Sequence, residues 1–280
     1  MKKEPIIQKL INWAQQTAAV RAIVLTSSMA STAQADVDVF SDFDAVVYTN
    51  SSAFFASDEW LSFFGTVLVR WPQKPQSTFD KNWITRLIIF ESRLRIDFQI
   101  TENSEIIPND VDGGYEVLVD KDGITKKFPT PTHSDYLIKK PSEEQFLTCL
   151  NDYFWDATYV AKYLRRGELF FAKYVLDYAL RFEYFEKMIE WHIGSQNNWN
   201  VTTNKHGRYF TRYLSPNTWH EIQATFAGSD INDNWEAFFK MNSIFTHLAK
   251  EVATHLNYQY PTEQENKMME YYSQSREITL

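Results

Sequence analysis

The stretch Phe40-Ser41-Asp42-Phe43-Asp44-Ala45-Val46-Val47-Tyr48 decides the fold, because it reads as a β-strand that begins with two carboxylates. Successive side chains of a strand point to opposite faces of the sheet. Asp42 and Asp44 therefore share one face, and the apolar residues between and after them share the other. Close carboxylates repel one another, and Mg²⁺ prefers oxygen ligands together with substrate phosphates. For an isolated pair of this kind, two incidental exposed acids at the start of a strand are the more common explanation, and a metal and phosphate site is the alternative that the surrounding sequence strengthens.

Composition narrows the class of protein. The chain has 280 residues, with 44% hydrophobic and 23% charged residues, which suits a globular protein of two modest domains or one large one. It contains 8 glycines and neither of the Gly-rich phosphate-binding motifs GxGxxG and GxxxxGK[ST]. The net charge of −8 disfavours nucleic acid as a partner and suits a cationic ligand.

Targeting and redox signals are absent from the sequence as given. A single cysteine, Cys149, excludes an internal disulfide and a Cys-based zinc site. The start shows no signal peptide, and no stretch approaches the roughly 18 to 20 apolar residues of a membrane span. We therefore expect a cytoplasmic location and no membrane partner, and we expect a monomer.

The first half alternates helix and strand patterns. Helical spacing of apolar residues predicts a helix over 6–14, and a β-branched run predicts a strand over 21–26. A second helix is expected over 54–64, a short strand at 67–69, a hairpin from 86–90 and 94–100, and an edge strand at 115–119. In the hairpin Asp97 shares a face with Arg95 and Gln99. It is a third strand carboxylate, and it would lie beside Asp42 and Asp44 if their strands are neighbours.

The second half is helical. A proline-containing stretch over 129–141 marks a domain boundary, and Ser142-Glu143-Glu144-Gln145 reads as a capping box that starts a helix. Apolar stripes at helical spacing then predict helices over 146–164, 169–189, 219–226 and 235–256, the last ending before Pro261. The sequence thus predicts an α+β fold, with a mixed sheet flanked by helices in residues 1–135 and an α-helical bundle in residues 136–280.

Several segments resemble the aminoglycoside 6-adenylyltransferases, which belong to the nucleotidyltransferase superfamily of polymerase β type. The general pattern is a strand, a Ser-rich turn, a D-x-D strand and a third acid on a later strand. The resemblance covers roughly Ile6 to Tyr272. Its main segments are Ser41-Asp42-Phe43-Asp44, Phe90-Glu91-Ser92-Arg93-Leu94-Arg95-Ile96-Asp97, Val117-Leu118-Val119-Asp120-Lys121-Asp122-Gly123, Phe154-Trp155, Phe171-Ala172-Lys173-Tyr174-Val175-Leu176-Asp177, Glu190-Trp191-His192-Ile193-Gly194 and Tyr258-Gln259-Tyr260-Pro261.

The resemblance implies a nucleotidyltransferase domain over 1–135 and a helical substrate-binding domain over 136–280. It implies Mg²⁺-dependent transfer of AMP from ATP to an aminoglycoside such as streptomycin. The implied catalytic and metal-binding residues are Asp42, Asp44 and Asp97, and Asp97 could be a metal ligand or the base. The implied nucleotide-binding residues are Ser27, Ser28, Lys173 and Lys205, and the implied substrate-binding residues are Asp152, Trp155, Asp156 and Asp177.

Several of these residues also have a purely structural explanation. Ser28 could be a helix N-cap, the two lysines could be solvated surface residues, and Trp155 could be a core aromatic. The family turn usually reads Gly-Ser-Arg where this chain has Ser27-Ser28-Met29, and a family Gly-Lys pair appears as Asn204-Lys205. The second hypothesis is therefore a catalytically altered nucleotide-binding protein on the same fold, or a transferase with another nucleotide or acceptor.

Overall fold

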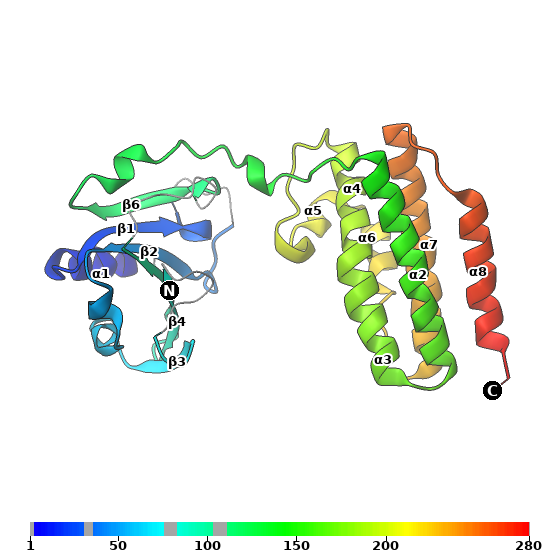
Figure 1. The fold of residues 1–280 in the computed structure, drawn as a ribbon, viewed down its shortest axis with the longest axis horizontal. Helices are drawn as coiled ribbons and strands as arrows, with labels where there is room; N and C mark the ends of the chain where they lie inside the picture. The colour runs from blue at the N-terminus through cyan, green and yellow to red at the C-terminus, as the bar shows by residue number, and fades with distance from the viewer. Residues whose placement is uncertain (1–2, 31–35, 76–82, 103–110, 280) are drawn as a thin grey trace. The chain divides into compact units, whose positions relative to one another are not determined.

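The chain divides into two compact units. The computed structural model describes residues 3–30, 36–75, 83–102 and 111–279, and the units span Met1–Asp135 and Tyr136–Leu280 (Figure 1). The first unit contains a mixed sheet and the second is helical, which confirms the predicted α+β class. Within the described ranges no helix is both long and apolar enough to cross a membrane.

A six-stranded sheet forms the first unit, in the order β3-β4-β5-β2-β1-β6. The strands are β1 (Val20–Thr26), β2 (Phe43–Thr49), β3 (Val67–Trp71), β4 (Trp83–Phe90), β5 (Arg95–Thr101) and β6 (Tyr115–Asp120). Neighbouring strands are antiparallel except β2 and β5, which are parallel and central. The predicted hairpin of β4 and β5 and the predicted edge position of β6 are both confirmed.

One face of this sheet carries the larger core. Helix α1 (Lys3–Gln16) packs its buried Ile7, Leu10 and Trp13 against apolar residues of β1, β2, β4 and β5. The predicted helix over 54–64 is wrong in type, because the segment forms two 3₁₀ helices, η2 (Ser52–Phe55) and η3 (Glu59–Phe63). Trp60 stacks on Trp13 and Phe55 packs edge-on against it, so the tertiary packing of large rings outweighs helix propensity in this segment.

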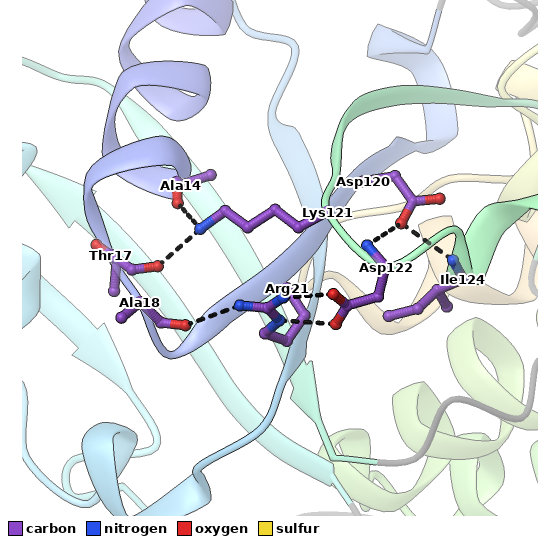
Figure 2. A network of polar contacts seen from close by, with 8 residues as sticks. All are labelled: Ala14, Thr17, Ala18, Arg21, Asp120, Lys121, Asp122 and Ile124. Atoms are coloured by element: carbon purple, nitrogen blue, oxygen red, sulfur yellow. Dashed lines mark hydrogen bonds and ion pairs between the residues drawn. The ribbon is translucent and has the colours of Figure 1, made fainter.

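A polar network attaches the edge strand to the rest of this unit (Figure 2). Lys121 donates to the carbonyl oxygens of Ala14 at 2.7 Å and Thr17 at 3.0 Å, and so anchors the end of β6 to α1. Arg21 donates from Nε to Asp122 at 2.7 Å. Asp120 accepts from the backbone of the turn before η5 (Ile124–Lys127), which η6 (Ser134–Tyr136) follows. Hydrogen bonds from charged side chains thus hold the end of β6, a strand whose residues are mostly half-buried.

Helices alone form the second unit. Its long helices are α2 (Glu143–Arg165), α4 (Glu186–Gln196), α7 (Ile231–Leu256) and α8 (Thr262–Glu277). Figure 1 shows α2, α4 and α7 packed side by side, with α8 along α2. Shorter helices are α3 (Leu169–Lys173), η8 (Lys205–Gly207), α5 (Phe210–Tyr213) and α6 (Pro216–Gln223). The predicted capping box is confirmed, because Ser142 and Gln145 each accept a hydrogen bond from the other's backbone N–H.

Two features of the helical unit differ from the sequence prediction. The helix predicted over 169–189 contains a π-helix, η7 (Tyr174–Phe185), between α3 and α4. Helix α8 was not predicted, because its composition is strongly polar and only Glu265, Tyr272 and Ser275 are buried. Tyr272 secures it by donating to the carbonyl oxygen of Phe154 at 2.8 Å. A helix held by so few buried residues shows a weak hydrophobic stripe in its sequence.

Candidate active site

The turn after β1 is a single 3₁₀ turn, η1 (Ser27–Met29). Ser27 is exposed and has φ of 56°, in the left-handed region that costs a residue with a Cβ roughly 1–2 kcal/mol. Ser28 lies inside the turn rather than at its N-cap position, which Thr26 occupies. Met29 is buried in the core of the unit, so the turn carries hydroxyl groups but no cation.

The two central strands bring together the acids that the sequence singled out. Asp44 on β2 and Asp97 on β5 are partners in the parallel register, and Thr26 of β1 is the antiparallel partner of Asp44. Phe43 and Ile96, one residue earlier, belong to the large core on the opposite face. The alternation of the strands therefore presents Asp44 and Asp97 together on the face away from that core.

Arg95 connects Asp42 to this pair. Its guanidinium lies 3.1 Å from Asp42 Oδ2 through Nη1 and 2.8 Å from Asp97 Oδ2 through Nη2. Its Nε also donates to Asp97 Oδ1 at 3.1 Å, which makes the second contact bidentate. Asp42, Asp44, Arg95 and Asp97 thus form one electrostatic cluster, and the neighbouring Ser27 hydroxyl hydrogen-bonds to Asp44.

Burial and mutual repulsion dominate the titration of this cluster. Desolvation and then the charge of Asp97 raise the pKa of Asp44 from 3.8 to about 6, although the Ser27 hydroxyl opposes the shift. The pKa of Asp42 is also raised, chiefly by desolvation, while Arg95 opposes the rise. The cluster therefore holds more negative charge than one guanidinium compensates, and such a group of carboxylates favours binding of a further cation.

A magnesium ion is the group that the family resemblance implies here. Hard carboxylate oxygens on one face suit Mg²⁺, which usually binds one or two protein carboxylates and completes its shell with water and phosphate. Among the residues that the structure describes, no three His, Cys, Asp or Glu side chains are arranged to hold a metal by themselves. The donor chemistry fits the ion, and the assignment of Asp42, Asp44 and Asp97 as its ligands stays a prediction.

Two of the expected binding residues of the helical unit contact one another. Lys173 Nζ lies 2.6 Å from Asp177 Oδ2 and donates to the carbonyl oxygen of Ala227 at 2.7 Å. Asp177 also contacts Arg181 at 3.2 Å, and Arg181 in turn donates to Thr225. These bonds join the π-helix to the segment after α6. The arrangement gives Lys173 and Asp177 a structural role that the sequence did not reveal.

The other expected residues lie on or near a pocket of the same unit. A pocket of about 1080 Å³ is lined by Asp152 and Lys205, together with residues of α2, α4 and the loop after α4. Asp156 accepts a hydrogen bond from Tyr184, which lines that pocket, at 2.9 Å. Trp155 is 66% exposed, so the alternative of a buried core aromatic is wrong.

The structure adds residues that motif reasoning missed. Glu186 and Glu190 line the pocket, and desolvation raises the pKa of both. Glu186 lies 3.4 Å from His206 Nδ1, and Glu190 accepts from Thr203 at 2.7 Å. Arg95 and Glu190 lie within segments that carry the family resemblance, which was the signal available in the sequence. Their contacts required the folded chain.

Comparison with known proteins identifies the family of this chain. The family model described as "Streptomycin adenylyltransferase" matches residues 1–275. An aminoglycoside 6-adenylyltransferase of Bacillus subtilis (strain 168) is 31% identical over 80% of this chain and 81% of its own length. One from Campylobacter jejuni is 30% identical over 90% of this chain and 88% of its own. One from Staphylococcus aureus is 28% identical over 95% and 96%.

A solved structure is also similar. The crystal structure of an aminoglycoside 6-adenyltransferase from Bacillus subtilis aligns over 98% of both chains, with 24% identity and a TM-score of 0.49. The assignment rests on the family model and on the sequence relatives, whose matches span most of both proteins. The chain therefore belongs to the streptomycin adenylyltransferase family, a family of nucleotidyl-transferring enzymes.

Proposed function

We propose that this protein transfers AMP from ATP to a hydroxyl group of an aminoglycoside such as streptomycin, with Mg²⁺ as the metal. The observation that carries the proposal is the pairing of Asp44 and Asp97 on adjacent parallel strands, with Asp42 connected to them through Arg95. The names of the relatives, aminoglycoside 6-adenylyltransferases, support the donor and the acceptor class. The unit over 1–135 is the nucleotidyltransferase domain in this proposal.

The reaction needs charge neutralisation and in-line placement rather than a covalent enzyme intermediate. The acceptor oxygen bonds to the α-phosphorus, the bond to the β-phosphate oxygen breaks, and pyrophosphate leaves. Asp42 and Asp44 would hold the Mg²⁺ that accompanies the triphosphate. Asp97 would share the metal or accept the proton of the acceptor hydroxyl. When bound, Mg²⁺ supplies positive charge that stabilises the developing charge on the phosphate oxygens. Ser27 and Ser28 present hydroxyl groups beside the carboxylates and would bind phosphate oxygens.

The helical unit over 136–280 binds the acceptor in this proposal. Its pocket places the carboxylates of Asp152, Glu186 and Glu190 around a volume of about 1080 Å³. Guanidinium and ammonium groups of an aminoglycoside pair well with carboxylates, and exposed aromatics such as Trp155 can stack on them. Lys205 in the same pocket would contact the triphosphate. Asp156 is a further proposed acceptor contact. Asp177 and Lys173, which pair with each other, are proposed contacts of the acceptor and of the triphosphate respectively.

The direct test measures the mass of the reaction product. Protein is incubated with MgATP and streptomycin, and then with a panel of other aminoglycosides, and the acceptor mass and pyrophosphate release are measured. We expect a mass gain of one AMP unit, lost with EDTA and in Asp42→Asn. The matched control Asp122→Asn removes a carboxylate of the same unit that pairs with Arg21, and it should keep turnover. Absence of any AMP adduct across the panel would refute the proposal.

The second candidate is a nucleotide-binding protein that does not turn over. It is favoured by Ser27, which adopts a left-handed conformation with a Cβ, and by the buried, uncharged Met29 in the same turn. Calorimetry with ATP, CTP and GTP in the presence of Mg²⁺ separates the two functions. A non-catalytic binder gives a binding isotherm without pyrophosphate release, and preference for CTP or GTP would instead indicate a transferase with another donor.

A further inference from the structure

Arg95 differs from Arg86, on the neighbouring strand β4, in its burial and in its partners. Arg86 is fully buried, and it donates from Nε to Asp58 at 2.9 Å and from Nη1 to the carbonyl oxygen of Pro72. Arg95 has a side chain that is 42% exposed, and its polar contacts are to Asp42 and Asp97. It therefore balances the charge of the reaction site itself, whereas Arg86 stabilises the fold.

The contacts of Arg95 use the same oxygens that the metal–nucleotide would require. A guanidinium that bonds both oxygens of Asp97 and one of Asp42 competes with a divalent cation for them. Once those carboxylates bind a metal, the positive charge of Arg95 loses its partners. A triphosphate brings new negative charge to the same place, and a planar guanidinium can bind two phosphate oxygens at once.

The phosphate turn supplies no cation of its own. Ser27 and Ser28 are neutral, and Met29 is buried at 4% exposure. Arg95 lies on β5 two residues before Asp97, its guanidinium contacts the carboxylates proposed to hold the metal, and its side chain is partly exposed. Its long side chain can move between the two sets of oxygens without a change in the strand, because the backbone of β5 is fixed by pairing with β2 and β4.

We propose that Arg95 is a nucleotide-binding residue that changes partners during binding. In the free protein it pairs with Asp42 and Asp97, and in the metal–nucleotide complex its guanidinium leaves these carboxylates and binds triphosphate oxygens. The inference rests on the proposed function, since it takes a metal–nucleotide as the ligand of this cluster. It assigns opposite effects to one side chain: Arg95 opposes binding of a metal alone and favours binding of the metal–nucleotide.

Two calorimetric titrations test the proposal on the full chain. The first uses Mn²⁺ without nucleotide, and the second uses a non-hydrolysable ATP analogue with saturating Mg²⁺. Loss of a charge-assisted contact changes affinity by about tenfold or more. For Arg95→Ala we expect Mn²⁺ to bind about tenfold more tightly and the analogue to bind at least about tenfold more weakly. Arg95→Lys keeps the charge without the planar fork, so both affinities should fall between those of the wild type and Arg95→Ala.

Arg70→Ala is the matched control. Arg70 is 41% exposed and pairs with Asp58 at 2.7 Å, away from the cluster, so its removal should leave both affinities unchanged. Unchanged affinities in Arg95→Ala, or two affinities that move in the same direction, would overturn the change of partners while the proposed function stands. Failure of the wild type to bind the analogue at all would overturn the proposed function, and with it this inference.

Discussion

Replacement of Asp44 by asparagine should stabilise the metal-free protein at neutral pH while abolishing its activity. Ionisation of Asp44 at neutral pH lowers the stability of the folded protein, because desolvation and the charge of Asp97 raise the pKa of Asp44 from 3.8 to about 6. A pKa raised in the folded state means that the folded protein binds the proton more strongly than the unfolded chain. The stability that this proton supplies is complete below about pH 4 and is lost as the pH rises through about 6.

The magnitude follows from the size of the shift. About two pKa units at roughly 1.36 kcal/mol each give about 3 kcal/mol, which is an upper bound because Asp44 retains contact with solvent. Asparagine keeps the oxygen that accepts from Ser27 and carries no charge. Asp44→Asn should therefore match the wild type near pH 4 and exceed its unfolding free energy by up to about 3 kcal/mol at pH 8.

Hydrogen exchange of the β2 amides is the suitable assay, because it reports on the unit that contains Asp44. Exchange is measured by mass spectrometry in EDTA between pH 5 and 8, with correction for the intrinsic rate at each pH. Asp122→Asn is the control of opposite sign. The hydrogen bond from Arg21 lowers the pKa of Asp122, so this variant should lose protection at neutral pH. A stability difference for Asp44→Asn that does not grow with pH would refute the reasoning.

Three further predictions concern stability and titration. Arg86→Ala should destabilise the first unit by about 3 kcal/mol in urea unfolding, because Asp58 loses its fully buried partner and keeps the more exposed Arg70, and an effect below about 1 kcal/mol would contradict the buried pair. Asp112 should titrate with a pKa of about 2 in a carboxyl NMR experiment, because hydrogen bonds from Thr132 lower its pKa. Thr132→Val should raise the pKa of Asp112, and an unchanged pKa would count against those hydrogen bonds. Ser142→Ala should cost about 1 kcal/mol in thermal unfolding through loss of the capping box, and an unchanged melting temperature would exclude that role.

Local patterns in the sequence determined much of the fold. Alternation of polar and apolar residues identified β2 and β5 and the face of Asp97, and the Ser142 capping box located the start of α2. These features depend on residues two to four positions apart, so the chain encodes them without reference to distant partners. The α+β class follows from the same periodicities, because each half of the chain keeps one kind of pattern.

Only the tertiary structure decided which strands meet and which charges pair. Asp44 and Asp97 lie 53 positions apart, and their contact requires the parallel pairing of β2 with β5. The ion pair of Arg95 with Asp42 joins residues 53 positions apart, so it depends on the fold and on the Arg95 rotamer rather than on local spacing. The sequence by itself thus supplied the carboxylates and their faces. The packing of distant segments determined that they form one cluster, since strand register is set by long-range burial rather than by local preference.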